Sequence, residues 1–326
     1  MIIKKRRRKE MTEKKEDVKK LIMYLAITFA ATYAVEICAC LFLKDLIQII
    51  LVLVGVMFIP MIVTLIVCRG LTPKRSGVLW KPDFKKSIGW LLLAWFLPAL
   101  MTAAGAAVYF AVFPKNFSSE LYGLSAMLTQ QGMEIKDGTF NGAPLDIIAI
   151  SQAVSSVIIA PFINAIPALG EEIGWRGFMT PAFTRLWGRR PALIVSGVIW
   201  GLWHAPLIVL IDYEYSGEYV GKPWTGVALF CLITCCLGVI LSFLYDKTKS
   251  IIAPALMHGA FNAIAALPFY FLSDLNVNML LGPAPNGLIA AIPMLILTAV
   301  LLFAVKEPQI KNDENKTEEQ IEEQPV

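Results

Sequence analysis

The chain has 326 residues, of which 57% are hydrophobic and only 17% are charged, and its net charge is +4. Soluble domains average about 45–50% apolar and about 25% charged residues, so this composition excludes an ordinary water-soluble domain and predicts an all-α, polytopic membrane helix bundle. The six cysteines lie in or beside apolar segments without a CxxC pair, which argues against a disulfide framework and a structural thiolate zinc site.

A basic segment, residues 1–20, opens the chain and carries ten lysines and arginines. It leads into an apolar run of about twenty residues, which is too long for the apolar region of a typical signal peptide. We therefore expect this segment to lie in the cytoplasm and to orient the first span. We also expect it to bind anionic lipid and not nucleic acid.

Eight apolar segments have about the length of a spanning helix, which needs roughly 20 residues. In chain order they are residues 21–43, 46–68, 88–113, a fourth within 147–180, then 191–211, 224–245, 251–272 and 287–305. They predict one transmembrane domain over residues 21–305 with about eight helices. A polar, acidic tail at 306–326 follows, and we expect it to be disordered and cytoplasmic.

Lysine and arginine are distributed among the connections as the positive-inside rule expects. The N-terminus, residues 69–87, 170–190 and 246–250, and the tail together hold 25 of them, whereas the intervening connections hold four. This split supports eight spans in the cell membrane with both termini in the cytoplasm.

The position of the fourth span is ambiguous. Residues 147–180 would form a helix of about 51 Å, against an apolar bilayer core of about 30 Å. Pro161 and Pro167 offer break points, so the span is either 147–169 or 158–180. We expect the second register, because only that one puts Glu171 at a membrane depth where it can reach the histidines.

Ionisable groups within the spans point to function, since burying them in lipid is costly. Both histidines of the chain lie in apolar segments. An acidic pair, Glu171 and Glu172, lies at the end of a third apolar segment. Each helix also carries residues four positions apart, which share a face. The pairs are Glu172 with Arg176, Trp200 with His204, and His258 with Asn262. Each pair alone is typical of a helix salt bridge or interhelical packing, but together they predict one assembled polar site.

Three motifs carry a resemblance to a known family. They are Glu171-Glu172-Ile-Gly-Trp-Arg176, or EExxxR; Trp200-Gly-Leu-Trp-His204, which resembles FxxxH; and His258-Gly-Ala-Phe-Asn262, or HxxxN. In this order, over about residues 150–265, they resemble the CPBP family of CAAX-prenyl proteases and bacteriocin-processing enzymes, also called the Abi family. Trp200 replaces the usual Phe and keeps an aromatic wall beside the histidine.

The resemblance implies an intramembrane endopeptidase that hydrolyses a peptide bond by activated water. Its substrate would be a membrane-associated CAAX-like, bacteriocin or leader peptide, or a lipidated protein. By resemblance, Glu171 is the base and His204 helps to hold the water, while His258 and Asn262 stabilise the oxyanion. Glu172 with Arg176 would support the site, and Glu172 could share in catalysis.

Two chemistries stay open in the sequence. Glu171, His204 and His258 could supply three ligands to a catalytic zinc and leave one position for water. The same residues could also act without metal, as a glutamate-dependent site.

Two other functions would use the same residues. One is a non-catalytic membrane immunity or scaffold protein of the same fold, against which the intact set of Glu, His and Asn argues. The other is a proton-coupled transporter with Glu and His as a relay. The lack of visible internal repeats argues against common transporter designs.

Overall fold

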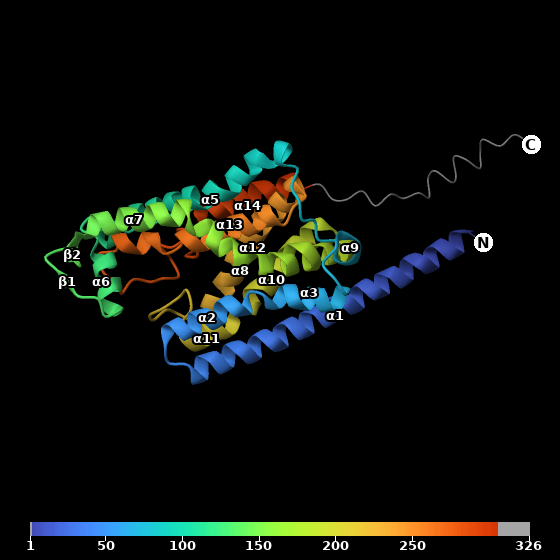
Figure 1. The fold of residues 1–326 in the computed structure, drawn as a ribbon, viewed down its shortest axis with the longest axis horizontal. Coiled ribbons are helices and arrows are strands. Elements are labelled where there is room, and N and C mark those ends of the chain that lie inside the picture. Colours follow the sequence, from blue (N-terminus) through green and yellow to red (C-terminus); the bar gives the residue numbers. More distant parts are fainter. Residues whose placement is uncertain (1, 306–326) are drawn as a thin grey trace, which may run out of the picture.

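The computed structural model describes the backbone of residues 2–305 and the side chains of residues 14–45 and 47–305. This part of the chain is a bundle of long helices (Figure 1). Within it, six helices are long and apolar enough to cross a membrane, and a bent helix pair raises the number to seven. The all-α, polytopic fold is thereby confirmed. The eighth expected span, 287–305, contains only the shorter helix α14 (Ile292–Ala304), and the expected tail, 306–326, lies outside the described residues.

The first two spans lie side by side at one edge of the bundle (Figure 1). Helix α1 (Ile2–Phe42) joins the basic N-terminal segment to the first span without a break. The second span consists of α2 (Leu46–Val56) and α3 (Ile59–Cys68). The short helix α4 (Pro73–Ser76) then leads into the long span α5 (Phe84–Val112).

Small elements after α5 cover one end of the bundle. They are η1 (Pro114–Asn116), α6 (Tyr122–Gln130) and an antiparallel sheet of β1 (Ile135–Lys136), β2 (Thr139–Phe140) and β3 (Ala143–Pro144), in the order β1-β2-β3. The Ser118 N–H donates to the Phe271 carbonyl at 2.8 Å, and the Ser273 N–H donates to the Asn116 carbonyl at 2.9 Å. These bonds tie the region to η3 (Leu267–Phe271).

The fourth expected span is a bent helix pair whose second helix begins at Ala160, close to the start of the expected register 158–180, and its depth in the membrane stays a prediction. Helices α7 (Leu145–Ile158) and α8 (Ala160–Gly174) meet at 48°, and α8 continues through the π-helical turn η2 (Trp175–Met179) into α9 (Thr180–Trp187). Pro161 explains the bend, because it has no N–H for the Val157 carbonyl and its ring crowds that carbonyl. The Trp95 indole of α5 donates to the Val157 oxygen at 2.6 Å and so satisfies it.

The fifth span is also interrupted near a proline, whose missing N–H leaves a backbone carbonyl without its helical partner. It consists of α10 (Arg189–Trp203) and α11 (Ala205–Ile211), with His204 at the junction. Pro206 cannot donate to the Leu202 carbonyl. That carbonyl instead accepts a hydrogen bond from the Tyr33 hydroxyl of α1 at 2.6 Å. The break therefore ties α1 to the segment that carries one of the two histidines.

The C-terminal half forms the centre of the bundle with α8 and α10. Helix α12 (Trp224–Thr248) packs on α10, and α13 (Ile252–Ile264) packs on α8. A Cβ added at Gly259 of α13 would lie 2.4 Å from the backbone nitrogen of Ala165 in α8. The two backbones can approach this closely only because the residue is glycine.

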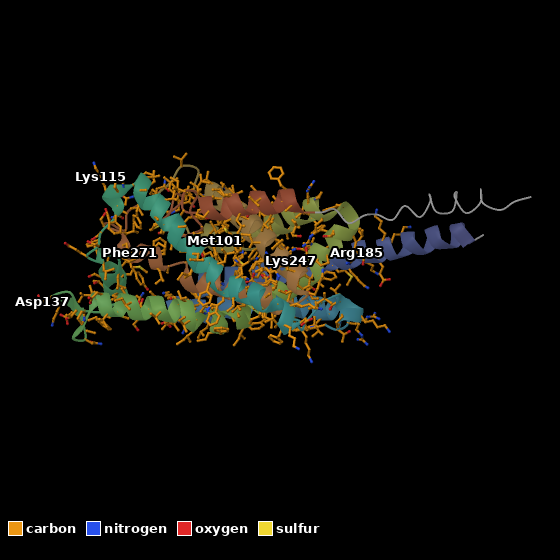
Figure 2. All side chains as sticks on the ribbon, turned by 90° about the horizontal axis from the view of Figure 1, so that it is seen from above. Met101, Lys115, Asp137, Arg185, Lys247 and Phe271 are labelled. Carbon is orange, nitrogen blue, oxygen red and sulfur yellow. The ribbon has the colours of Figure 1, made fainter. Side chains whose placement is uncertain are left out.

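The connections rich in lysine and arginine gather at one end of the bundle. Arg185 Nε lies 2.7 Å from Asp17 Oδ2, and Arg189 Nη2 lies 2.6 Å from Asp246 Oδ2, so three of these regions touch one another. In Figure 2, Arg185 and Lys247 lie toward this end, and Lys115, Asp137 and Phe271 lie at the other. The fold thus separates the connections into the two predicted groups, and the assignment of the basic end to the cytoplasm stays a prediction.

Candidate functional site

The acidic pair lies at the C-terminal end of α8, inside the bundle. The exposed fractions of Glu171 and Glu172 are 1% and 0%. Immediately after them the helix widens into the π-helical turn η2, which carries Arg176. Such turns are frequent at functional sites, because they shift the direction of the side chains that follow.

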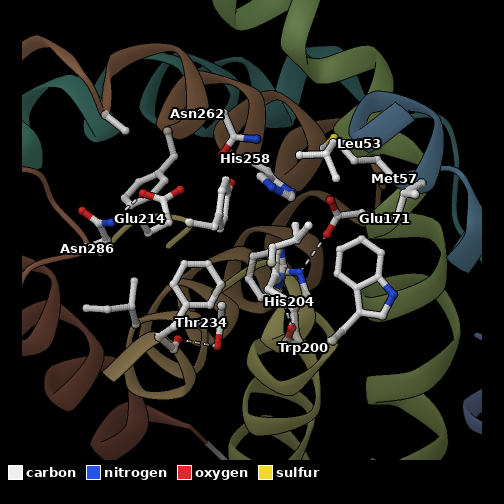
Figure 3. Close-up of a pocket in the computed structure, with 18 of the residues that line it drawn as sticks. Leu53, Met57, Glu171, Trp200, His204, Glu214, Thr234, His258, Asn262 and Asn286 are labelled. Carbon is white, nitrogen blue, oxygen red and sulfur yellow. Dashed lines mark hydrogen bonds between the residues drawn. The ribbon is translucent and has the colours of Figure 1, made fainter. Parts of the chain in front are cut away.

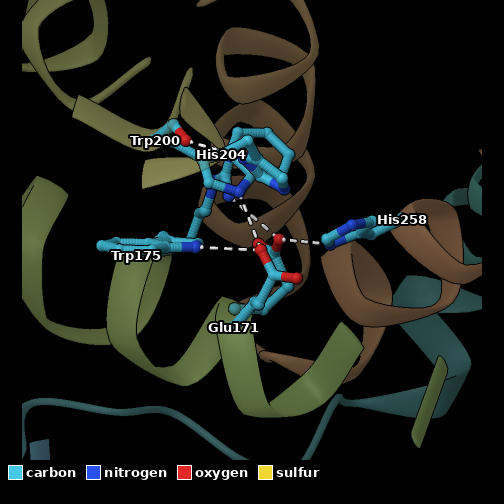
Figure 4. Close-up of polar contacts among 7 residues, drawn as sticks. Glu171, Trp175, Trp200, His204 and His258 are labelled. Atoms are coloured by element: carbon cyan, nitrogen blue, oxygen red, sulfur yellow. Dashed lines mark hydrogen bonds and ion pairs between the residues drawn. The ribbon is translucent and has the colours of Figure 1, made fainter. Parts of the chain in front are cut away.

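Glu171 is held by two tryptophans (Figure 4). Its Oε2 accepts the Trp175 indole at 3.1 Å and the Trp200 indole at 2.7 Å. The other oxygen, Oε1, accepts no hydrogen bond from the residues that the structure describes. One carboxylate oxygen is therefore fixed, and the other is available to a ligand or to water.

The Glu172 carboxylate has its own partners, the Arg176 guanidinium and the His258 ring. Its Oε1 lies 2.9 Å from Arg176 Nη1 and 2.9 Å from His258 Nδ1. With Glu172 ionised, His258 Nδ1 is the donor of this contact. The two glutamates of the motif therefore have separate partners, as their rotation of about 100° on the helix predicts.

His204 is oriented by its own helix. Its Nδ1 lies 3.0 Å from the Trp200 carbonyl oxygen. Because a carbonyl only accepts, Nδ1 carries the proton, and Nε2 of the neutral ring is left as an acceptor. The rings of Trp203 and Phe230 flank the imidazole, with centroids at 4.7 and 4.9 Å.

Trp200 connects the parts of the site. Besides its bond to Glu171, its ring lies 4.1 Å from the Arg176 guanidinium carbon and 5.2 Å, edge to face, from the His258 ring. A phenylalanine at this position would form the same wall but could not donate to Glu171. The departure from the FxxxH motif therefore adds a hydrogen bond that the sequence interpretation missed.

A cavity of about 300 Å³ brings most of the predicted site residues together (Figure 3). Four of them line it, namely Glu171, His204, His258 and Asn262. Glu172 and Arg176 stand behind His258 and do not line the cavity. His204 bonds to Trp200, with which it was paired on one helix face, and it shares the cavity with Glu171 without a direct hydrogen bond among the described residues.

The cavity lining also includes two carboxylates and one amide that were not predicted: Glu36, Glu214 and Asn286. Glu36 could have been found, because it lies in the first apolar segment and an ionisable residue at that depth is a candidate functional group. Glu214 and Asn286 lie in connections after α11 and before α14, where no sequence pattern distinguishes them from ordinary loop residues.

The predicted zinc ligands do not surround one position in this arrangement. Within the described residues, no group of three His, Cys, Asp or Glu side chains is placed so that it could hold a metal ion. His258 Nδ1 faces Glu172, and Glu171 Oε2 is taken by two indoles. Glu171 Oε1 and His204 Nε2 are not engaged by these bonds, and the zinc ligand set of Glu171, His204 and His258 stays a prediction.

Comparison with known proteins points to the same stretch of chain. Residues 153–264 match the family described as type II CAAX prenyl endopeptidase Rce1-like. CAAX prenyl protease 2 of Methanococcus maripaludis is 28% identical over 147 residues, which cover 44% of this chain and 49% of that protein. The chain thus matches about half the length of this curated relative. The matched region, 153–264, contains all six predicted site residues.

Proposed function

We propose, on the premise that residues 153–264 belong to the CPBP family, that this multi-pass membrane protein is an intramembrane endopeptidase. The substrate would be a membrane-associated peptide of the CAAX-like, leader or bacteriocin type, or a lipidated protein. The observation that carries the proposal is the pairing on one cavity of a carboxylate with one free oxygen and an imidazole with a free Nε2.

The free Glu171 Oε1 and His204 Nε2 would hold a water molecule between them. Glu171 would take a proton from this water as its oxygen attacks the peptide carbonyl carbon. The proton would then pass to the amide nitrogen as the C–N bond breaks, which restores the carboxylate. Trp175 and Trp200 would keep Glu171 in one orientation throughout, so that only Oε1 exchanges the proton.

His258 and Asn262 are suited to the oxyanion. They lie one helical turn apart on α13 and both line the cavity. The contact of Nδ1 with Glu172 fixes the orientation of the His258 ring, and an Nε2–H of this ring would donate to the developing negative charge. Arg176 neutralises Glu172, so it is a positioning residue that acts through the histidine.

The test is peptide cleavage by the detergent-purified protein against a panel of membrane-associated peptides. Glu171→Gln should lower kcat by about 10²–10⁴-fold, the usual contribution of a general base. Glu134→Gln is the matched control, since Glu134 is exposed in the 114–146 connection and pairs only with Lys136. Equal cleavage by wild type and Glu171→Gln would contradict the assignment.

The same preparation decides the chemistry of the site. A glutamate-dependent site should cleave equally before and after treatment with a strong chelator. Loss of cleavage that is restored by zinc would support the metal-dependent alternative. If no peptide is cut and a partner protein is bound equally by wild type, Glu171→Gln and His258→Ala, the scaffold function is favoured.

A further inference from the structure

The cavity is acidic beyond what hydrolysis requires. Its lining includes three carboxylates, Glu36, Glu171 and Glu214, and no lysine or arginine of the described residues. Glu171 belongs to the proposed reaction, whereas the other two have no part in it. In Figure 3, Glu214 and Asn286 lie at one end of the cavity and Glu171 and Trp200 at the other.

Glu36 is a buried carboxylate that lacks a partner. It lies on α1 with an exposed fraction of 1%, and its Oε2 is fully buried without a hydrogen bond from the described residues. No ion pair with it is present in that part of the chain either. A buried charge is costly unless it is paired and hydrogen-bonded. Because this carboxylate lines the cavity, a cationic ligand there would supply the missing partner.

Glu214 is held in place by the fold. Asn286 Nδ2 donates to its Oε2 at 2.6 Å, and the Asn286 carbonyl in turn accepts the Tyr215 hydroxyl at 2.9 Å. The backbone at Glu214 has φ +68°, a conformation that a non-glycine residue adopts at some cost. Burial raises the pKa of the Glu214 carboxyl, and a bound cation would offset that effect.

The remaining lining suits an organic cation. The rings of Tyr213, Phe230 and Trp203 line the same cavity, and aromatic faces attract ammonium and guanidinium groups. A metal ion is less well matched, because the described residues hold no third His, Cys, Asp or Glu side chain placed to complete a ligand set with this pair. A lysine or arginine side chain, with an apolar stem and a charged head, fits carboxylates among aromatic rings.

We propose that the cavity that Glu36 and Glu214 both line is a specificity subsite for a basic side chain of the substrate peptide. The inference rests on the proposed endopeptidase function and names the class of peptide that the site selects. Since Glu214 and Glu171 lie at opposite ends of the cavity, the basic residue would stand at a fixed distance from the scissile bond.

The test compares peptide pairs that differ only in charge. In a cleaved peptide, lysine is placed at each position around the scissile bond in turn, and each peptide has a partner with the uncharged norleucine. At one position, wild type should prefer lysine by about tenfold or more in kcat/KM. Glu36→Gln and Glu214→Gln should each bring this ratio toward one, because the lysine peptide loses more kcat/KM than its norleucine partner does.

The control and the charge reversal make the test specific. Glu218→Gln changes a carboxylate in the same connection whose side chain is 95% exposed, and it should leave the ratio unchanged. Glu214→Arg should shift the preference from lysine to glutamate at the same position. Equal cleavage of lysine and norleucine peptides at every position would overturn the subsite and leave the endopeptidase function standing.

A binding measurement tests the subsite separately from the chemistry. The Glu171→Gln variant should bind the lysine peptide about tenfold more tightly than its norleucine partner, and Glu36→Gln added to it should remove the difference. Equal binding of the two peptides overturns the inference, whether or not wild type cleaves them. A lysine preference in binding without cleavage by wild type would support the subsite and contradict the proposed function.

Discussion

Trp200 is the residue at which this chain differs from the motif that it otherwise matches. Its indole donates to Glu171 Oε2 at 2.7 Å, in addition to the wall that an aromatic ring provides. A hydrogen bond to a charged group contributes about 1.5–3 kcal/mol, which corresponds to roughly 10–100-fold in rate if it orients the base. We therefore expect Trp200→Phe to lower kcat by about that factor with a smaller effect on KM.

The control for this substitution is Trp95→Phe. It also removes one indole hydrogen bond, of 2.6 Å to the Val157 carbonyl, but Trp95 does not line the cavity. Peptide cleavage and thermal unfolding are measured for both variants. If Trp95→Phe lowers kcat as much as Trp200→Phe does, the loss reflects general packing and not the orientation of Glu171.

Substitutions of Glu171 and Glu172 should have different effects on activity and on thermal stability. Glu172→Gln leaves Arg176, which is 3% exposed, without its counter-charge, and breaking a buried pair in this way costs about 3–5 kcal/mol. Glu171 has no ion pair in the described structure, so Glu171→Gln should remove activity with little loss of stability. Thermal unfolding in detergent should show a clear decrease only for Glu172→Gln. Equal decreases for both variants would contradict the separate roles.

The site was predictable from sequence where residue type and spacing carry the information. Ionisable residues at membrane depth and residue pairs four positions apart identified Glu171, His204, His258 and Asn262, and all four line the cavity, as does Trp200 of the same motifs. The partners of those residues were not predictable, because Trp200–Glu171 and His258–Glu172 join positions 29 and 86 residues apart. Contacts of this kind depend on helix packing, which the local pattern does not specify.

The packing of α13 on α8 determines whether the two halves of the site meet. A Cβ at Gly259 would lie 2.4 Å from Ala165 N and 2.6 Å from the Pro161 carbonyl oxygen, both of them backbone atoms that cannot move aside. Gly259→Ala should push the helices apart, at a cost of about 1–3 kcal/mol, and separate His258 from Glu172. We expect a lower melting temperature and a loss of cleavage together.

Gly89→Ala is the matched substitution for this prediction. Gly89 lies within α5, and a Cβ there would have no heavy atom within 4 Å. Alanine is the better helix former by about 1 kcal/mol, so Gly89→Ala should keep or raise the melting temperature. Unchanged stability and cleavage in Gly259→Ala would show that α13 and α8 do not need this close approach.

Proline positions explain which element boundaries were missed. Prolines at 161 and 167 were both recognised as break points, and the register 158–180 begins near the break at Ile159, but the pairing of two bent helices in one segment was not predicted. The choice depends on Trp95, on a different helix, which satisfies the carbonyl freed by Pro161. The division of the fifth span at His204 was also missed, although Pro206 stands two residues further on. A proline removes one backbone hydrogen bond of the helix. Whether the helix breaks there depends on whether a side chain of another helix satisfies the freed carbonyl.

At the scale of the whole molecule, the distribution of charge was the most informative sequence property. The connections that hold most of the lysine and arginine touch one another through the Arg185–Asp17 and Arg189–Asp246 pairs and through an Arg190 hydrogen bond to the Val305 carbonyl at 3.1 Å. The number of spans was less predictable, because α14 is apolar but only 13 residues long. The apolar composition of this segment predicts a helix that avoids water. Its length of 13 residues is what distinguishes it from the longer helices that can cross a membrane.

Both termini should lie on the cytoplasmic side, since the basic end of the bundle holds the N-terminal end of α1 and the C-terminal end of α14 (Figure 1). A reporter that is active only in the cytoplasm should therefore work when it is fused after residue 305. The same reporter inserted at Gly138, in the connection at the opposite end, should be inactive. A second reporter that needs the extracytoplasmic side should give the reverse pattern. Cytoplasmic activity at Gly138 would invert the topology and place the basic end of the bundle outside the cytoplasm.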